Sequence, residues 1–332
     1  MKRGCCVKAT CGLDGILRVA ACSACVALFG RVDFAFGESV IPACTETVRS
    51  SGANETCTWK MFNRRLGLFV HWGIYSVGEW HEQERMRLGM ARVEYEKYAA
   101  RFAAEKFDAD ALVAAARSFG AEYIVFTTKH HDGFCMWDTQ TTPFNVMNTP
   151  ARRDIVGEVA AACKRGGVRL GFYYSNPDWH HPNAYNALST HQIPPEPGDT
   201  PDLEKYRSYV RSQITELLTK YGEIVCFFWD IPTKVEDSDM NKLARRLQPG
   251  IMINDRGWGA HGDYSTPERD VPEGTLFSHY TEACDSVGAD SWGYRNNEDY
   301  HTVGYLTRSI DAILSMGGNY LLNIGPASNG VI

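Results

Sequence analysis

The feature that most constrains the fold is a regular alternation, from residue 60 onward, of apolar runs with helical patterns. The strand-like runs are "LGLFVHWG" (66–73), "EYIVFTTKH" (122–130), "VRLGFYYS" (168–175), "EIVCFFWD" (223–230), "GIMINDRG" (250–257) and "NYLLNIGP" (319–326). The helical patterns between them cover 93–102, 109–120, 155–167, 203–222, 240–248 and 305–318. Nearly continuous apolar strands separated by helices are typical of a parallel sheet that is covered on both faces.

Polar residues gather at the C-terminal end of every predicted strand. They are His71, Lys129 with His130 and His131, Tyr173 with Ser175, Asp230, Asn254 with Asp255 and Arg256, and Asn323. An open sheet binds its ligand at a switch point and uses only a few strands, whereas a barrel brings all its strand ends to one site. The sequence therefore predicts an α/β fold of the (β/α)8-like TIM-barrel type, with two weaker strands inside 275–295.

Composition bounds the partners and the organisation of the chain. The 332 residues carry a net charge of −6, which argues against a nucleic acid or an anionic membrane as partner. The basic start and the small apolar residues at 16–30 resemble a signal peptide, so we expect a leader at 1–37 and an exported protein, periplasmic or secreted. Residues 38–59 are predicted to be a linker and 60–332 a catalytic domain. No later segment is long and apolar enough to span a bilayer.

The stretch "TTKHHDGFCMWDT" (127–139) allows either a metal site or a sugar site. A metal would be bound by His71, His130 and His131, but adjacent histidines on a strand point to opposite faces and cannot easily share one ion. A sugar needs neutral donors and acceptors beside an apolar wall, and Phe134 and Trp137 supply such a wall. No Cys-x-x-Cys pair occurs beyond the leader. These residues favour a sugar site over a metal site.

Seven ordered motifs from about residue 60 to the end carry a resemblance to a known family. They are "LGLFVHWGIYSVGEW", "TTKHHDGFCMW", "GFYYS", "INDRGW", "GDYSTPE", "SWGY" and "GGNYLLNIGP". Together they resemble the α-L-fucosidases of glycoside hydrolase family 29. The resemblance implies a retaining exo-α-L-fucosidase that removes terminal α-L-fucose from a fucosylated oligosaccharide or glycoconjugate through a covalent fucosyl-enzyme intermediate. It also implies that neither a metal nor an organic cofactor takes part.

The catalytic residues that the resemblance implies are two carboxylates. Asp230, at the end of "CFFWD", matches the nucleophile. Glu268 in "GDYSTPE" matches the acid/base of some members, and Glu282 matches the position argued for others, so Glu282 stays open as the alternative. Most members carry Trp two positions before the nucleophile and often Gly after it; here Phe228 and Trp229 precede Asp230, and Ile231 and Pro232 follow.

The remaining roles also follow from the resemblance. The expected sugar-binding residues are His71, Glu79, Trp80, His130, His131, Tyr173, Arg256, Phe228 and Trp229. Ser291–Tyr294 and Asn323 are interpreted as barrel framework. Because of the departures around Asp230, two alternatives stay open: a catalytically impaired fucose-binding protein, and an exo-glycosidase for another galactose-configured sugar on the same scaffold.

Family members usually continue into a final helix and a C-terminal β-sandwich domain, and we expect that domain to be absent from this chain. The sequence leaves open whether the chain is a fragment truncated at its C-terminus, or a protein that covers the flank of the barrel by forming a homo-oligomer or with its N-terminal segment.

Overall fold

The structure is a computed structural model that describes residues 65–332, except 186–189, 260 and 273. The predicted leader at 1–37 and the predicted linker at 38–59 lie outside the described residues, and the predicted domain at 60–332 is described from Arg65 onward. Within the part of the chain that is described, none of the helices has the length and apolar character needed to cross a membrane.

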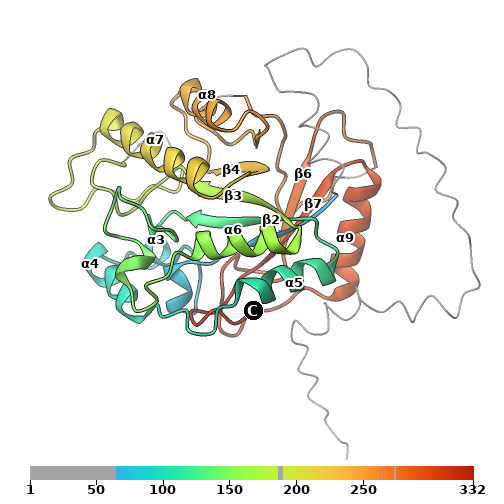
Figure 1. The fold of residues 1–332 in the computed structure, drawn as a ribbon, viewed down its shortest axis with the longest axis horizontal. Helices are drawn as coiled ribbons and strands as arrows, with labels where there is room; N and C mark the ends of the chain where they lie inside the picture. The colour runs from blue at the N-terminus through green and yellow to red at the C-terminus, as the bar shows by residue number, and fades with distance from the viewer. Residues whose placement is uncertain (1–64, 186–189, 260, 273) are drawn as a thin grey trace, which may run out of the picture.

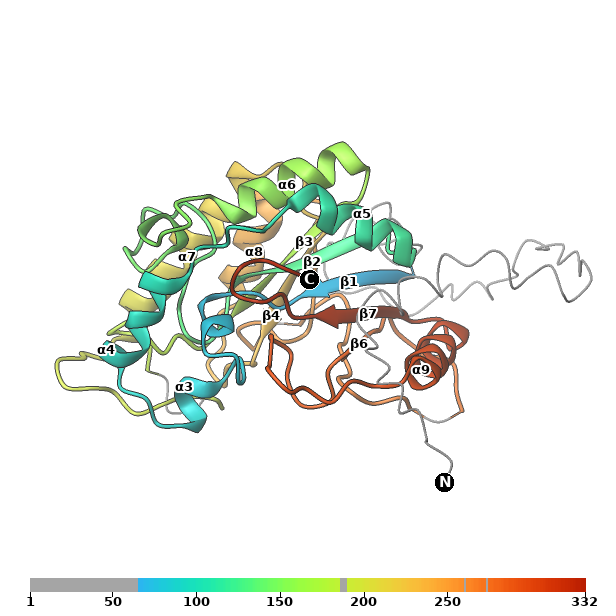
Figure 2. The same cartoon turned by 90° about the horizontal axis from the view of Figure 1, so that it is seen from below.

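Seven parallel strands form one curled sheet in the order β5-β4-β3-β2-β1-β7-β6 (Figures 1 and 2). Their bounds are β1 Leu66–Val70, β2 Tyr123–Lys129, β3 Arg169–Ser175, β4 Cys226–Asp230, β5 Met252–Ile253, β6 Glu282–Ser286 and β7 Asn319–Ile324. Six of the seven strands fall within or overlap the runs predicted from the sequence. All six neighbouring pairs are parallel, so every strand presents its C-terminal end to the same side of the molecule.

The two edges of the sheet are joined by residues 264–268, which fill an eighth place in the ring. On one side, the backbone N–H of Asp255 donates to the carbonyl of Tyr264 at 3.0 Å; on the other, the N–H of Glu282 donates to the carbonyl of Ser265 at 2.9 Å. Isolated parallel bridges connect the same segments. The barrel expectation is thus met, but only β6 lies inside 275–295. The prediction of a second strand there is wrong, because the eighth segment comes earlier in the chain.

Helices cover the outside of the sheet. The longer ones are α5 Ala109–Phe119, α6 Ile155–Gly166, α7 Leu203–Lys220, α8 Ser238–Leu247 and α9 Val303–Ser315, and the shorter helical turns are η2 Ile74–Val77, α3 Glu84–Arg87, α4 Arg92–Tyr95, η3 Glu96–Arg101 and η4 Val146–Asn148. An Asp or Thr side chain caps the N-terminus of each longer helix by accepting from its first-turn N–H groups. In Figure 2, α5, α6, α7 and α8 lie on one side of the curled sheet and α9 lies beside β6 and β7.

Side-chain alternation along the strands divides the core into two apolar layers. The layer inside the ring contains Phe69, Tyr123, Val125, Tyr173, Val225, Cys226, Phe228, Met252, Tyr264, Cys284 and Leu321. Their strand neighbours point outward to the helices, as Phe227 and Trp229 do on β4. On β4 the alternation sets the direction of every side chain up to Asp230, which points inward like Phe228.

Gly325, directly after β7, lies where two backbone segments pack too closely to admit a side chain. A Cβ at Gly325 would lie 2.4 Å from the backbone carbon of Gly293 and 2.6 Å from the backbone nitrogen of Tyr294. We expect Gly325→Ala to lower the free energy of unfolding by about 1–3 kcal/mol, because backbone atoms would have to move. The control is Gly304→Ala in α9, where the nearest atom is 3.4 Å away and alanine favours the helix. Equal stability of the two variants in denaturant unfolding would contradict the prediction.

Candidate active site

Asp230 ends β4 and is the carboxylate around which the candidate site is built. Its side chain is buried, with the residue 9% exposed, and both oxygens have partners. The Tyr173 hydroxyl donates to Oδ2 at 2.6 Å, and the Arg256 Nη1 group donates to Oδ1 at 3.0 Å. The Nε2 atom of His131 lies 3.8 Å from Oδ2. Tyr173 lies in β3, whereas His131 and Arg256 lie two and three residues beyond the ends of β2 and β5, so the site sits where the strand ends converge.

Arg256 joins Asp230 to Glu268. The same Nη1 atom that bonds Asp230 lies 2.7 Å from Oε2 of Glu268. The other guanidinium nitrogens bond Thr266, with Nε donating to the Thr266 hydroxyl at 2.7 Å and Nη2 to the Thr266 carbonyl. Because both contact the same nitrogen atom, Oδ1 of Asp230 and Oε2 of Glu268 lie close to each other. The structure brings together the two carboxylates that the sequence predicted, Asp230 and Glu268.

The charges at this pair are set by opposing effects. Burial alone would raise the pKa of Asp230, but the Arg256 charge, His131 and the Tyr173 hydroxyl outweigh burial and lower the pKa to about 2. Burial would lower the pKa of Arg256, yet the charge of Asp230 raises it overall. Burial together with the neighbouring Asp230 also raises the pKa of Tyr173 well above its usual value. At neutral pH Asp230 is therefore an anion, and Tyr173 keeps its proton as a donor.

Three buried histidines lie beside Asp230 or its partner Tyr173. His71 follows β1 and bonds Oδ1 of Asn323 through Nδ1 at 2.7 Å, and Nδ1 of His131 bonds the Ser175 hydroxyl at 2.6 Å. Because the Asn323 oxygen can only accept, His71 carries its proton on Nδ1, leaving Nε2 for another partner. The His130 ring stacks on Tyr173 at 5.7 Å, and its Nδ1 has no hydrogen-bond partner within the described residues.

Burial keeps these histidines uncharged. It lowers the pKa of His71, lowers that of His130 well below its usual value, and lowers that of His131 to about 4. Neutral rings of this kind can donate and accept hydrogen bonds to hydroxyl groups. In the described part of the chain, no group of three or more His, Cys, Asp or Glu side chains has a geometry that could hold a metal ion.

Two aromatic neighbours of Asp230 behave differently from each other. Phe228 lies inside the barrel, with the Arg256 guanidinium 5.5 Å from its ring centre. Trp229 points the other way: its Nε1–H donates to Oδ1 of Asn241 in α8 at 2.9 Å. The structure therefore does not bring Trp229, an expected sugar contact, into the site, because alternation along β4 directs it to the helix layer.

Glu79 and Trp80 lie on the outer rim of the loop after β1. Glu79 is exposed and adopts a φ of 56°, and Trp80 is 36% exposed with its ring 5.8 Å from His81. The Asn296 N–H donates to the Glu79 carbonyl at 2.8 Å, which places the rim against the loop after β6. These two expected sugar contacts are thus not buried beside Asp230, as the histidines are.

Glu82 is a buried carboxylate near the site that the sequence analysis missed. Its Oε2 accepts from the Ser291 hydroxyl at 2.6 Å and from the backbone N–H groups of Trp292 and Gly293 at 3.0 and 3.2 Å. Burial would raise the pKa of Glu82, but His81 and these donors lower it overall. No pattern in the sequence indicates bonds to residues 209, 210 and 211 positions further along the chain.

Trp292, predicted to be framework only, also faces the site. Its ring centre lies 5.4 Å from that of His71 and 6.3 Å from that of Phe69. Its backbone is held on both sides, because Glu82 accepts from its N–H and the Asn323 Nδ2 group donates to its carbonyl at 2.7 Å. Asn323 thus serves the framework role that was predicted and also fixes His71. An aromatic residue after a strand end was the available signal for Trp292.

Glu282 lies at the opposite end of the barrel from Asp230. It is the first residue of β6, is fully buried, and accepts from the hydroxyl of Tyr123, which begins β2. Burial raises the pKa of Glu282 to about 7, and the Tyr123 hydroxyl only partly offsets this. Because Asp230 is the last residue of a parallel strand, the structure does not bring Glu282 and Asp230 together.

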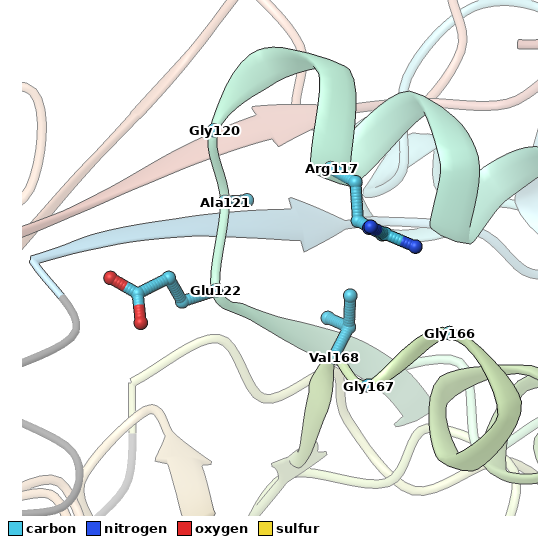
Figure 3. Close-up of a pocket in the computed structure, with 7 residues that line it drawn as sticks. All are labelled: Arg117, Gly120, Ala121, Glu122, Gly166, Gly167 and Val168. Atoms are coloured by element: carbon cyan, nitrogen blue, oxygen red, sulfur yellow. The ribbon is translucent and has the colours of Figure 1, made fainter.

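A pocket of roughly 330 Å³ lies away from this chemistry (Figure 3). It is lined by Arg117, Gly120, Ala121, Glu122, Gly166, Gly167 and Val168, at the ends of α5 and α6. Figure 3 shows Arg117 and Val168 facing the same space, while the Glu122 side chain points away. These residues precede β2 and β3, so the pocket is on the N-terminal side of the sheet and takes no part in the candidate site.

Fold and site together define an α/β-barrel protein with a carboxylate pair at the C-terminal strand ends. The family model described as alpha-L-fucosidase matches residues 42–332, and the chain belongs to that family. The tissue alpha-L-fucosidase of Rattus norvegicus is 31% identical over 303 residues, which cover 81% of this chain and 63% of the relative. For the enzyme of Homo sapiens the identity is 29%, over 81% of this chain and 62% of the relative. The chain thus spans less than two thirds of the length of these relatives.

Solved structures agree with the family. Alpha-L-fucosidase isoenzyme 1 from Paenibacillus thiaminolyticus superposes with a TM-score of 0.77 and 34% identity, over 83% of this chain and 71% of that one. The alpha-L-fucosidase AlfC from Lactobacillus casei, in complex with the alpha-L-fucose product, gives a TM-score of 0.75 and 28% identity, over 83% of this chain and 93% of that one.

The raised pKa of Glu282 predicts a pH dependence of stability. Between its ordinary pKa of 4.5 and about 7, the folded protein holds a proton that the unfolded chain has lost. The contribution of Glu282 to the free energy of unfolding therefore falls as pH rises through this window and stays low above it. Glutamine does not ionise, so Glu282→Gln does not lose stability in this way. We therefore expect the difference in Tm between this variant and wild type to shift in favour of the variant from pH 5 to pH 8. The control is Glu105→Gln at an exposed position. An unchanged difference between Glu282→Gln and wild type at the two pH values would contradict the prediction.

Proposed function

We propose that this chain is a retaining exo-α-L-fucosidase, with residues 60–332 as its catalytic domain. The observation that carries the proposal is the Arg256 Nη1 atom, which lies 3.0 Å from Asp230 and 2.7 Å from Glu268. This geometry allows the separation of about 5–5.5 Å between two carboxyl groups that retaining glycosidases use. The relatives named as alpha-L-fucosidases support the substrate class.

In the first step Asp230 acts as nucleophile. One of its oxygens forms a bond to the anomeric carbon as the bond from that carbon to the leaving oxygen breaks, and Glu268 gives its proton to the leaving oxygen. Asp230 is suited to the attack because it is ionised at neutral pH. Arg256 and Tyr173 fix its orientation, so it need not reorganise before attack.

In the second step water replaces the leaving group. Glu268, now ionised, takes a proton from the water while the water oxygen bonds to the anomeric carbon, and the bond to Asp230 breaks. Glu268 has a side chain 40% exposed, so water and a leaving group can reach it. Glu282 lacks this access at the far end of the barrel, which supports Glu268 as the acid/base.

The neutral histidines supply the sugar contacts in this proposal. We propose that His71, His130 and His131 bond fucose hydroxyls and that Phe228 and Trp292 form the apolar wall. AlfC from Lactobacillus casei has been solved with alpha-L-fucose and, as an aspartate-to-alanine variant, with Fucα(1,6)GlcNAc. These complexes support a terminal fucose on a glycan as the substrate class here. Export of the protein stays a prediction.

The role of Asp230 is tested by removing its carboxylate. We expect Asp230→Ala to abolish nearly all turnover of 4-nitrophenyl α-L-fucopyranoside and azide to restore part of it, because the cavity can admit an external nucleophile. The matched control is Asp255→Asn, an exposed neighbouring carboxylate that should retain most activity. Near wild-type turnover in Asp230→Ala without azide would reject the assignment.

The alternative functions are tested on the wild-type protein. Turnover of an aryl β-galactoside instead of the fucoside would favour another sugar as substrate, and turnover of neither would favour a binding protein.

The role of Glu268 is tested by leaving-group dependence. We expect Glu268→Ala to lose about 10²- to 10⁴-fold in kcat/KM on natural glycosides, whose leaving oxygen must be protonated. It should lose little on dinitrophenyl fucoside, whose leaving oxygen departs unaided. The alkaline limb of the pH-rate profile should also disappear.

Two controls separate this role from a structural one. Glu282→Ala should show only a folding defect, and Asp270→Asn, at an exposed position close to Glu268, should behave as wild type. If the leaving-group dependence appears in Glu282→Ala instead, the roles of the two glutamates must be exchanged.

A further inference from the structure

The residue after Asp230 has an unfavourable backbone conformation. Ile231 has a φ of 57°, in the left-handed region that glycine enters without a steric penalty and that β-branched residues rarely adopt. Among the described non-glycine residues with positive φ, it is the one with a β-branched side chain. This is also the position where the sequence departs from the glycine often found in the family it resembles. Something in the surrounding structure must therefore hold Ile231 in place.

Asn176, the residue directly after β3, makes the contacts that can do so. It is buried, and its backbone N–H donates to the carbonyl of Asp230 at 3.0 Å. Its side-chain Nδ2 donates to the carbonyl of Ile231 at 2.9 Å and to the carbonyl of Arg256 at 3.0 Å. One asparagine thus donates to three backbone carbonyls. Two of them belong to the ion pair of Asp230 and Arg256, and the third belongs to the strained Ile231.

The orientation of the Asn176 amide follows from these contacts. Both carbonyls that Nδ2 meets can only accept, so a flipped amide would place its oxygen against two other oxygens. Its Oδ1 is buried and has no hydrogen-bond partner in the described structure. The Asn176 backbone is fixed as well, because the Tyr206 hydroxyl from α7 donates to its carbonyl at 2.7 Å. Asn176 is therefore a rigid support whose two side-chain donors are both used.

The left-handed turn at Ile231 also affects Asp230 directly. The backbone N–H of Ile231 is one of the groups that favour the ionised form of the Asp230 carboxylate, together with Arg256, His131 and Tyr173. A relaxed backbone at Ile231 would turn that N–H away. Release of the Arg256 carbonyl would at the same time loosen the backbone that carries the guanidinium and change the distance from Nη1 to Asp230.

We propose that Asn176 is a positioning residue, which holds the left-handed Ile231 and the Arg256 backbone so that Asp230 and Arg256 keep their mutual geometry. Asn176 supplies by hydrogen bonds what a glycine after Asp230 would supply by its own conformational freedom. The inference rests on the proposed function only where Asp230 is taken as the nucleophile.

A double-mutant cycle of Asn176→Ala and Ile231→Gly tests this role. We expect Asn176→Ala to lower kcat on 4-nitrophenyl α-L-fucopyranoside by about 10²-fold, as misplacement of a reacting group does. KM should change much less, and the acid limb of the pH-rate profile should move to higher pH as Arg256 withdraws from Asp230. In the Ile231→Gly background the same substitution should cost at least about fivefold less, because glycine holds the turn without help.

Asn241→Ala is the matched control. Asn241 is also a buried asparagine that contacts β4, but it lies in α8 and accepts a hydrogen bond from Trp229, on the outer face of that strand. It should lower Tm without moving the acid limb. If Asn176→Ala does not fold, the double variant should fold, and its failure to do so would overturn the proposal.

Thermal unfolding of the four proteins gives a readout that does not depend on activity. We expect the Tm loss from Asn176→Ala to be smaller in the Ile231→Gly background. Additive Tm losses together with additive losses in kcat would overturn the positioning role. If the wild type does not hydrolyse the fucoside, the proposed function is rejected but the role of Asn176 is not. The coupling of the two substitutions in Tm would still test whether Asn176 holds Ile231.

Discussion

The site depends on one guanidinium group that lies between two carboxylates. Asp230 and Glu268 would repel each other whenever both are ionised, and without a nearby cation a buried Asp230 would tend to take up a proton. Arg256 prevents this through Nη1, while Nε and Nη2 bond Thr266 and fix the plane of the group. Lysine could not do the same, because its single nitrogen cannot bond Thr266 twice and still meet both carboxylates in a fixed geometry.

The fold was predictable wherever the strands are fully buried. β1, β2, β3, β4 and β7 lie inside their predicted runs because both of their faces contact apolar layers, which produces continuous apolar sequence. The segment 264–268 was not predictable. "YSTPE" has no apolar run, contains a proline, and joins its neighbours by a few backbone bonds instead of a full ladder. It completes the ring through backbone hydrogen bonds, which any residue type can make and which the sequence therefore does not reveal.

The candidate site was predictable where residues sit on strand ends and poorly predictable in loops. Asp230 ends a strand, and Arg256 and the three histidines follow strands, so the convergence of parallel strand ends places them together. Glu82 and Trp292 lie in loops whose path depends on contacts between distant segments, and the sequence does not encode that path locally. Trp229 shows a different limit: its position next to Asp230 in sequence suggested a shared role, yet adjacent residues on a strand face opposite layers.

The end of β2 shows how charge outside the barrel fixes neutral groups inside it. Lys129 points to the helix layer, where its Nζ lies 3.0 Å from Oδ2 of Asp178 and 4.4 Å from the ring centre of Tyr174. Such a buried pair is a poor source of stability, because removing both charges from water is costly. Its geometric effect is clearer, since it ties the loop after β3 to β2. The Trp179 N–H in that loop donates to the His131 carbonyl at 2.7 Å. The polar end of this strand therefore has two functions: one side chain anchors the neighbouring loop, and the histidine that follows, held by that loop, faces Asp230.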